Sequence, residues 1–283
     1  GRVHPGETPA SWMMRGLLDL LTGESVTAQR LRSMFIFKII PMLNPDGVLF
    51  GNNRCGLSAV DLNRAWKKPS RALHPTIYYT KAMIRHEHTV REVCAFIDLH
   101  GHSRKMNCFM YGCDDKKKPR PTVRVFPKLL SWNRLGGRYV SFKDCSFAVK
   151  KGREGTGRVV VAREINIKNS YTLEATFCGA DFGPLQDCHF NMEHLMEVGR
   201  GLGDALLDYY LPNHSSPTPA PLITLPNPGP QGAEPTTLVR SPLPPAESVN
   251  EVEEDIQGQE TPRGGGGGGG GGNAGESGYR LPE

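Results

Sequence analysis

The sequence predicts an α/β domain with a mixed, mostly parallel sheet flanked by helices, followed by a disordered C-terminal tail. Apolar runs typical of buried strands alternate with amphipathic segments typical of helices, the pattern of a sheet covered on both faces. The 283 residues suffice for one substantial domain. The composition changes near residue 212. We therefore expect a folded domain over residues 1–211 and a separate tail over residues 212–283.

The tail differs from the domain in both composition and charge. Residues 212–283 hold 13 of the 23 prolines and 14 of the 33 glycines, so they cannot bury enough apolar surface to offset the entropy of ordering them. They carry three Lys and Arg against nine Asp and Glu, whereas residues 1–211 carry 31 against 20. A domain with a formal charge of +11 favours acidic partners through long-range attraction.

The first predicted helix covers residues 10–21. Thr8 and Pro9 form a typical helix start, because threonine caps free N–H groups and proline is favoured at the first helical position. Apolar residues then recur at a spacing of about 3.6. The helix therefore begins directly after the tetrapeptide His4-Pro5-Gly6-Glu7.

Apolar runs predict the strands. Residues 34–43 form a nearly unbroken run, as expected for a strand covered on both faces, and the turn residues 44–47 end it. A helical pattern over residues 74–92 leads into a second buried-type strand over residues 93–99. Further strands are predicted over residues 108–112, 159–161 and 171–177, and an amphipathic helix over 192–210 closes the domain.

A candidate metal site lies at the start of the chain. His4 and Glu7, three residues apart, offer the nitrogen and oxygen ligands that zinc accepts, and His100 at the end of the strand 93–99 is the natural third ligand. Ligands gather at the carboxyl ends of strands in open α/β sheets. The spacing alone is not diagnostic, since His194 and Glu197 repeat it within the last helix, and Glu7 could instead cap the first helix.

Five motifs in fixed order carry a resemblance to a known family. They are His4-Pro5-Gly6-Glu7-Thr8, Asn44-Pro45-Asp46-Gly47, Asp61-Leu62-Asn63-Arg64, Asp98-Leu99-His100-Gly101-His102-Ser103 and Tyr171-Thr172-Leu173-Glu174-Ala175-Thr176. Over residues 1–205 the chain resembles the zinc metallocarboxypeptidases, specifically the cytosolic carboxypeptidase branch that removes glutamates from tubulin and other proteins. The resemblance implies a carboxypeptidase-like fold and an exopeptidase activity.

The resemblance also implies roles for individual residues. His4, Glu7 and His100 stand at the positions of the family's ligands for one zinc ion per chain, and Glu174 stands at the position of the general base. Zinc lowers the pKa of bound water and polarises a carbonyl, while a nearby carboxylate can move the proton. The alternative for Glu174 is a surface residue on an edge strand.

Further positions correspond to substrate binding. Asn63 and Arg64 match the pair that binds the substrate's terminal carboxylate, which the planar fork of arginine recognises bidentately. Arg54 matches the arginine that polarises the scissile carbonyl. The alternative for Arg64 is a structural salt bridge with Asp61.

Arg158 is the candidate for substrate specificity. It ends the basic, glycine-rich stretch 150–158, which precedes Glu174 by the interval that holds the wall of the side-chain pocket in the resembled family. A pocket for glutamate requires a cation at its base, and we expect Arg158 to supply it, with a solvated loop charge as the alternative. Lys116 to Lys118 would add attraction for a polyacidic chain.

The predicted partners are glutamylated or acidic-tailed proteins such as tubulin. Two other functions fit the same residues: a zinc amidohydrolase of small N-acyl amino acids, or a non-catalytic basic adaptor for acidic tails. Nucleic acid is not expected, because the chain shows no RNP, zinc-finger or helix-turn-helix signature.

The remaining expectations concern location and completeness. The seven cysteines are an odd set without a C-x-x-C pair, which indicates free thiols in a reducing compartment such as the cytosol. The resemblance to enzymes that act on tubulin implies an association with microtubules, and we expect a monomer. No run of 18 apolar residues exists to span a membrane. Since the chain does not begin with Met, we expect a fragment. In the resembled family, strands precede the His-Pro-Gly-Glu motif, so the resemblance implies that the first strands of the sheet are missing here.

Overall fold

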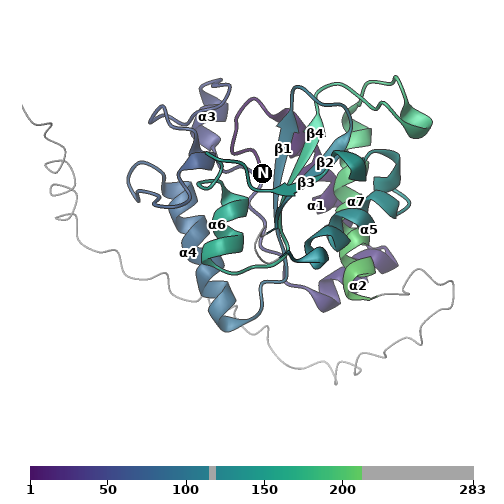
Figure 1. Cartoon of the computed structure of the whole chain (residues 1–283), viewed down its shortest axis with the longest axis horizontal. Coiled ribbons are helices and arrows are strands. Elements are labelled where there is room, and N and C mark those ends of the chain that lie inside the picture. The colour runs from purple at the N-terminus through teal and green to yellow at the C-terminus, as the bar shows by residue number, and fades with distance from the viewer. Residues whose placement is uncertain (115–118, 212–283) are drawn as a thin grey trace, which may run out of the picture. The chain divides into compact units, whose positions relative to one another are not determined.

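The computed structural model describes residues 1–114 and 119–211 (Figure 1). The predicted disordered tail over residues 212–283 and the cations Lys116 to Lys118 lie outside these residues. The helices are α1 (Thr8–Thr22), α2 (Val26–Met34), α3 (Pro45–Leu49), α4 (Pro75–Val90), α5 (Val125–Trp132), α6 (Gly157–Glu164) and α7 (Met192–Tyr210). The strands are β1 (Phe96–His102), β2 (Cys108–Asp114), β3 (Ser146–Ala148) and β4 (Ser170–Thr176).

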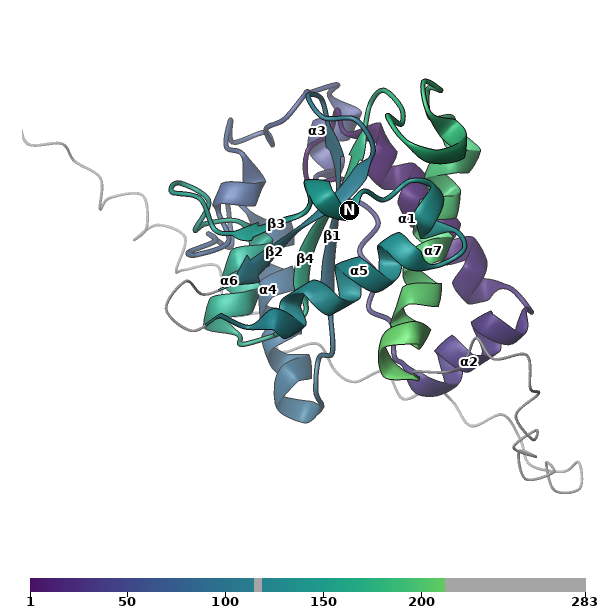
Figure 2. The same ribbon diagram turned by 45° about the vertical axis from the view of Figure 1, so that its right-hand side comes forward.

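The strands form one sheet in the order β1-β4-β2-β3. β1 pairs parallel with β4, β4 antiparallel with β2, and β2 parallel with β3, which confirms the predicted mixed, mostly parallel sheet. Helices α1, α5 and α7 cover one face, and α4 and α6 cover the other (Figures 1 and 2). β4 is therefore a central strand with helices on both faces, as its nearly continuous burial requires.

The larger core cluster lies between the sheet and the pair α1 and α7. These two helices approach so closely that only glycine fits at their contact. A Cβ atom on Gly199 would lie 1.9 Å from the carbonyl oxygen of Met13, and one on Gly16 would lie 2.0 Å from that of Met196. The contact fixes α1, and hence the residues immediately before it, against the sheet.

The smaller core cluster lies on the other face, between the sheet and helices α4 and α6. It contains the fully buried side chains of Trp66 and Ile77 together with Val160 of α6. The buried Lys81 of α4 donates to Glu164 of α6 at 2.7 Å and to the carbonyl oxygen of Trp66 at 2.7 Å. A buried ammonium is tolerated here because it has three acceptors, the third being the carbonyl oxygen of Lys67 at 2.9 Å.

The predicted strand over residues 34–43 is wrong. Met34 ends α2, and residues 35–40 are extended but belong to no strand within the described part of the chain. Their side chains alternate as in a strand, with Phe35 and Phe37 packed on the larger core and Ile36 63% exposed. The segment has the geometry of a strand. Among the described residues, its one backbone hydrogen bond to another segment runs from the amino group of Gly1 to the carbonyl oxygen of Ile40 at 2.8 Å, which does not make a strand pairing.

The predicted strand over residues 159–161 is also wrong, because these residues lie in α6. All three valines are buried, since α6 is inserted between the sheet and α4 and is covered on several sides. A short apolar run cannot distinguish a buried helix from a strand, and packing decided the outcome. The helices predicted over residues 10–21, 74–92 and 192–210 and the strands predicted near 93–99, 108–112 and 171–177 are confirmed.

All seven cysteines are free, as predicted. Cys108 and Cys113 are buried, whereas Cys178 and Cys188 are exposed. Within the described ranges, no helix combines the length and the apolar character that crossing a membrane demands.

Candidate metal centre

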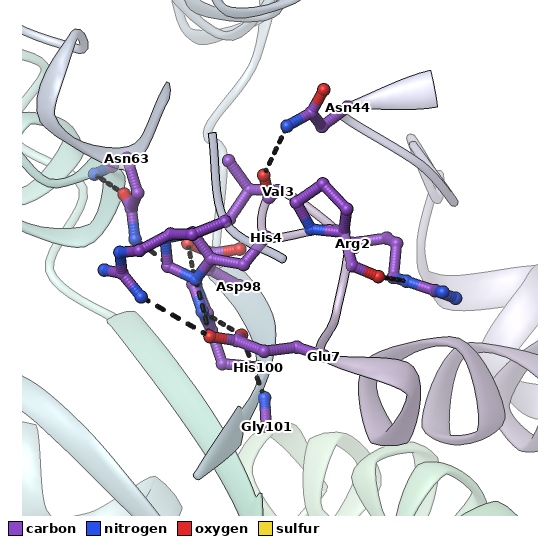
Figure 3. A network of polar contacts seen from close by, with 12 residues as sticks. Arg2, Val3, His4, Glu7, Asn44, Asn63, Asp98, His100 and Gly101 are labelled. Carbon is purple, nitrogen blue, oxygen red and sulfur yellow. Dashed lines mark hydrogen bonds and ion pairs between the residues drawn. The ribbon is translucent and has the colours of Figure 1, made fainter. Parts of the chain in front are cut away.

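His4, Glu7 and His100 meet where the loop before α1 reaches β1 (Figure 3). The potential ligand atoms of the three residues all lie within 4.8 Å of one another. His4 and Glu7 belong to the turn that leads into α1, whereas His100 lies inside β1 rather than beyond its end as the sequence suggested. The backbone N–H of Gly101 donates to Oε2 of Glu7 at 3.0 Å, which ties the turn to the strand.

Each imidazole presents Nδ1 to Glu7. Nδ1 of His4 lies 2.6 Å from Oε1 of Glu7, and Nδ1 of His100 lies 2.8 Å from Oε2. The opposite ring nitrogen of each histidine faces another carboxylate. Nε2 of His4 lies 3.0 Å from Asp61, and Nε2 of His100 lies 2.8 Å from Asp98.

Asp61 and Asp98 are functional candidates that the sequence analysis did not assign. Carboxylates on the distal nitrogen of a ligating histidine fix its tautomer and ring orientation in metal sites. Asp98 could have been found from its position two residues before His100, because residues two apart on a strand share a face. Asp61 carried no such local signal, since 57 residues separate it from His4.

The donor set fits a zinc ion. Two imidazole nitrogens and one carboxylate form the His₂Glu combination that catalytic zinc sites use.

The carboxylates around this cluster also favour a bound cation. Burial alone would raise the pKa of Glu7, but contacts with His100 and His4 outweigh it and lower the pKa to about 2. Burial would likewise lower the pKa of His100, yet Asp98 and Glu7 raise it well above its usual value. The carboxylates thus create a field that stabilises positive charge at this point.

Glu174 lies beside this cluster on β4. It is in register with His100 of β1 and with Phe109 of β2, so the three side chains project from the same face of the sheet. Because β4 is central, the alternative of an edge-strand surface residue is wrong. Burial raises the pKa of Glu174 to about 7, with His100 opposing the shift and Glu7 and Asp98 adding to it. A carboxylate with this pKa can both accept and return a proton near neutral pH.

Arg54 and Arg64 border the cluster through Asp61. Nε and Nη2 of Arg54 lie 2.9 Å and 2.8 Å from Oδ2 of Asp61, and its Nη1 lies 3.9 Å from Glu7. Arg64 donates to the carbonyl oxygen of Asn63 at 2.9 Å and lies 3.7 Å from Asp61. Asp61 therefore pairs closely with Arg54, and the guanidinium of Arg64, 30% exposed, is only weakly held by it.

Asn63 is buried and its amide is already engaged. Its Nδ2 lies 3.3 Å from Nε2 of His100, and its Oδ1 accepts from the backbone N–H of Gly157 at 2.9 Å. The residue thus connects the metal cluster to the start of α6. The structure brings Asn63 to the site that the sequence indicated. Nε2 of His100 is the donor to Asp98 and cannot also accept from Asn63, so the amide N–H groups of Asn63 can donate to a substrate.

Arg158 is a buried cation on α6, only 7% exposed, which rules out the alternative of a solvated loop charge. Its Nε donates to the carbonyl oxygen of Gly112 at 3.2 Å, and its guanidinium lies 5.4 Å from the ring centroid of Tyr111. Tyr111 is two residues from Phe109 and therefore projects from the same face as Glu174. Among residues 1–114 and 119–211, no carboxylate forms an ion pair with Arg158.

The second H-x-x-E pair serves the fold. His194 and Asn191 form a capping box at the start of α7. Glu197 accepts hydrogen bonds from the hydroxyl of Tyr139 and the guanidinium of Arg138. Identical spacing therefore produces a helix cap in one place and a candidate metal cluster in the other, because only the first pair faces a strand histidine.

Comparison with known proteins identifies relatives of this site. The model of the zinc carboxypeptidase family matches residues 1–192. The chain is 49% identical to cytosolic carboxypeptidase 2 of Xenopus tropicalis over 216 residues, and 48% identical to cytosolic carboxypeptidase 3 of Mus musculus over 219 residues. Each match covers 76% of this chain and 22% of the relative. The chain thus spans about a fifth of the length of these relatives.

Solved structures share the fold. The metallo-carboxypeptidase from Burkholderia cenocepacia superposes with a TM-score of 0.62 at 23% identity, over 74% of this chain and 55% of that protein. The metallo-carboxypeptidase from Pseudomonas aeruginosa gives a TM-score of 0.58 at 24% identity, over 72% of this chain and 55% of that protein. Both confirm the carboxypeptidase-like arrangement of sheet and helices.

Proposed function

Because the chain belongs to the zinc carboxypeptidase family, we propose that it hydrolyses terminal glutamates from acidic protein tails, either at the C-terminus or on glutamate side chains. The family fixes the broad chemistry and the metal. The choice of glutamate rests on one observation above all: Arg158 is a buried cation without a carboxylate partner among the described residues, on the same side of the sheet as Glu174. A buried charge in such a position requires a compensating ligand.

His4, Glu7 and His100 would hold one zinc ion, with Asp61 and Asp98 orienting the two imidazoles. Zinc supplies a lowered pKa for a bound water molecule and a Lewis acid for the scissile carbonyl. The protein supplies the dry, acidic surroundings that keep both rings in one orientation.

Glu174 would act as the general base. Its carboxylate accepts the proton of the attacking water and returns that proton to the leaving amine. Burial raises the pKa of Glu174 to about 7 before zinc binds, which favours return of the proton, while the charge of bound zinc favours the ionised form that accepts it. The register with His100 places this carboxylate one strand away from a metal-cluster residue.

Arg64 and Asn63 would bind the free α-carboxylate that an exopeptidase recognises. The loosely held guanidinium of Arg64 can form two parallel hydrogen bonds with a carboxylate. Arg54, whose guanidinium already contacts Asp61 and Glu7, would stabilise the negative charge that develops on the carbonyl oxygen.

Arg158 would bind the side-chain carboxylate of the terminal glutamate. The Tyr111 ring and the Gly112 carbonyl hold its guanidinium in place, so a substrate carboxylate would meet a preorganised cation. The formal charge of +11 over residues 1–211 would attract a polyacidic tail, such as that of tubulin, before it binds. The named relatives are called cytosolic, and we extend that location to this chain. We further propose that the chain is a monomer and associates with microtubules.

A peptide assay tests the proposal. The full chain, loaded with zinc, is incubated with synthetic peptides that end in glutamate, glutamine or leucine, and with a peptide bearing a glutamate branch. Mass spectrometry then records which residues are released, with and without a chelator. We expect release of single glutamates that stops when zinc is removed and when Glu174 is replaced by Gln. A small N-acyl amino acid is assayed in parallel, and its cleavage without release from any of the peptides would indicate an amidohydrolase instead.

A pair of variants tests the specificity. Arg158→Ala should lower kcat/KM for the glutamate peptide by about 100-fold while changing that for the leucine peptide by less than about threefold, because only the first carries a carboxylate for Arg158. Arg158→Lys keeps the charge and should retain part of the preference. Equal losses for both peptides would show that Arg158 supports the fold rather than the choice of substrate.

A further inference from the structure

Lys105 lies over the face of the sheet that carries Glu174. Its Nζ is 4.5 Å from the ring centroid of Phe109 on β2. Phe109 is in register with Glu174 on the neighbouring strand β4, and both side chains project from the same face of the sheet. The Phe109 ring is fully buried, and the Lys105 side chain forms part of its cover. The ammonium group therefore lies one strand away from the candidate general base.

The loop that carries Lys105 is held by His102. Nδ1 of His102 accepts hydrogen bonds from the backbone N–H groups of Arg104 and Lys105, each at 3.1 Å. The His102 ring also packs edge-on against Phe109, with 5.2 Å between the ring centroids. A ring nitrogen that accepts N–H groups carries no proton, so these contacts fix the tautomer and the turn together. The backbone from which Lys105 extends is thus fixed beside the site.

The ammonium group of Lys105 can take another acceptor. It donates to the carbonyl oxygen of Asp144 at 3.1 Å and faces the Phe109 ring. The Asp144 carboxylate is directed at Asn107 instead, whose Nδ2 lies 3.3 Å away. Over residues 1–114 and 119–211, Lys105 forms no ion pair with a carboxylate. An ammonium has three donors, so one remains for a ligand, and a carboxylate makes the strongest hydrogen bond with it.

Lys105 and Arg158 lie over neighbouring rings of β2. Phe109 and Tyr111 are two residues apart and project from the same face, with 5.4 Å between their ring centroids. The guanidinium of Arg158 lies 5.4 Å from the Tyr111 centroid. Because β2 runs antiparallel to β4, Phe109 lies nearer than Tyr111 to the carboxyl end of β4, where ligands gather in open α/β sheets. A substrate that enters there passes Lys105 before its last residue reaches Arg158.

We propose that Lys105 binds the side-chain carboxylate of the residue that precedes the scissile bond, so that the site selects two consecutive acidic residues. This inference rests on the proposed function, in which Arg158 binds the terminal glutamate. Two residues on one face of a strand are about 7 Å apart, an interval that the side chains of adjacent glutamates can span. The formal charge of +11 only brings an acidic chain near, whereas Lys105 would recognise one position of it.

Three peptides with the same terminal glutamate test this inference on the full, zinc-loaded chain. They end in Ala-Glu-Glu, Ala-Ala-Glu and Glu-Ala-Glu, and kcat/KM is measured for each. We expect the peptide ending in Ala-Glu-Glu to exceed the other two by about 10-fold or more, because it alone offers Lys105 a charge-assisted hydrogen bond.

Variants of Lys105 separate its charge from its packing. Lys105→Met removes the charge but keeps a long side chain over Phe109, so kcat/KM for Ala-Glu-Glu should fall about 10-fold or more and that for Ala-Ala-Glu much less. Lys105→Arg should retain most of the preference. Lys168→Met is the matched control: it removes the same charge at an exposed position before β4 and should leave the preference unchanged.

Binding of the same peptides to the Glu174→Gln chain, measured by calorimetry, tests the contact even where no peptide is cleaved. Tighter binding of Ala-Glu-Glu that Lys105→Met removes, without cleavage by the unaltered chain, would support the contact and contradict the proposed function. Release of the terminal glutamate with equal efficiency from all three peptides, or a preference for Glu-Ala-Glu, would overturn the inference and leave the proposed function standing. Equal losses for all peptides in Lys105→Met, with a lower melting temperature, would also overturn it, since Lys105 would then serve the loop alone.

Discussion

Oδ2 of Asp98 lies 2.8 Å from Nε2 of His100, and both side chains are at least 97% buried on the same face of β1. This contact leaves Nδ1 of His100 directed at Glu7. The ring cannot rotate without abandoning a buried carboxylate, which is expensive. Asp98 is thus a positioning residue: it holds the His100 ring and is not itself one of the three metal-cluster residues.

Replacement of Asp98 should therefore weaken zinc binding without removing a ligand. We expect Asp98→Asn to lower zinc affinity about 10-fold to 100-fold, because the amide no longer fixes the tautomer of His100. Competition with a chromogenic chelator measures the affinity. Asp19→Asn, on the outer face of α1 and paired with Arg15, is the matched control and should bind zinc as the unaltered chain does. An unchanged affinity in Asp98→Asn would contradict the positioning role.

The elements with clear periodicity or flanking signals were predictable from the sequence. Helix α1 has a proline start and a 3.6-residue apolar pattern, and α7 has a long amphipathic pattern, so local chemistry determined both. The segments over residues 35–40 and 159–161 were mispredicted because both are apolar and β-branched or aromatic. Residues 35–40 lack a partner strand, and residues 159–161 are packed between a sheet and a helix. Neither of these tertiary contacts can be recognised from the local sequence.

The candidate site likewise contains residues that the sequence could predict and contacts that it could not. His4, Glu7, His100 and Glu174 could be proposed because they stand in recognisable motifs, and the structure brings them to one face of the sheet. The contact between His4 and Asp61 depends on a loop folding back over 57 residues, which no spacing rule predicts. The burial of Arg158 follows from α6 lying against β2, a consequence of the same packing that overturned the strand prediction.

The contact between α1 and α7 makes a prediction for stability. Gly199→Ala places a methyl group 1.9 Å from a backbone carbonyl oxygen that cannot move independently of α1, so the helices must separate. We expect the free energy of unfolding to fall by about 3 kcal/mol or more, as overpacking typically costs 1–3 kcal/mol. Urea denaturation followed by circular dichroism measures it. Gly56→Ala, whose added methyl meets only the side chain of Leu62 at 3.6 Å, should change the stability by far less.

The raised pKa of Glu174 predicts a stability cost above neutral pH. The folded state binds its proton more tightly than the unfolded state does, so stability is lost as the pH rises from about 4.5 to about 7. In zinc-free protein, Glu174→Gln removes this loss. The stability gained by the variant should therefore be larger at pH 8 than at pH 5, by up to about 3 kcal/mol at 1.36 kcal/mol per pH unit.

The difference between two pH values removes the groups that do not interact with Glu174, because they contribute equally to both proteins. What remains is Glu174 together with its coupling to His100, Glu7 and Asp98. Chemical denaturation in the presence of a chelator gives the free energy of unfolding of both proteins at pH 5 and at pH 8. Glu24→Gln, at an exposed position after α1, should show no such difference. A variant equally stabilised at pH 5 and pH 8 would mean that the buried carboxylate is not the source.

The Glu174 carboxylate should also determine how kcat/KM falls at acidic pH. Glu174 accepts a proton only when ionised, so kcat/KM should fall about tenfold for each pH unit below its pKa. Bound zinc adds positive charge nearby and favours the ionised form, so the midpoint should lie at or below the value of about 7 set by burial. A peptide ending in glutamate carries a side-chain carboxylate that also titrates at acidic pH, whereas one ending in glutamine carries only the α-carboxylate that both share. If Glu174 is responsible, both peptides should show the same midpoint; a midpoint that moves with the substrate would assign the acid limb to the substrate carboxylate instead.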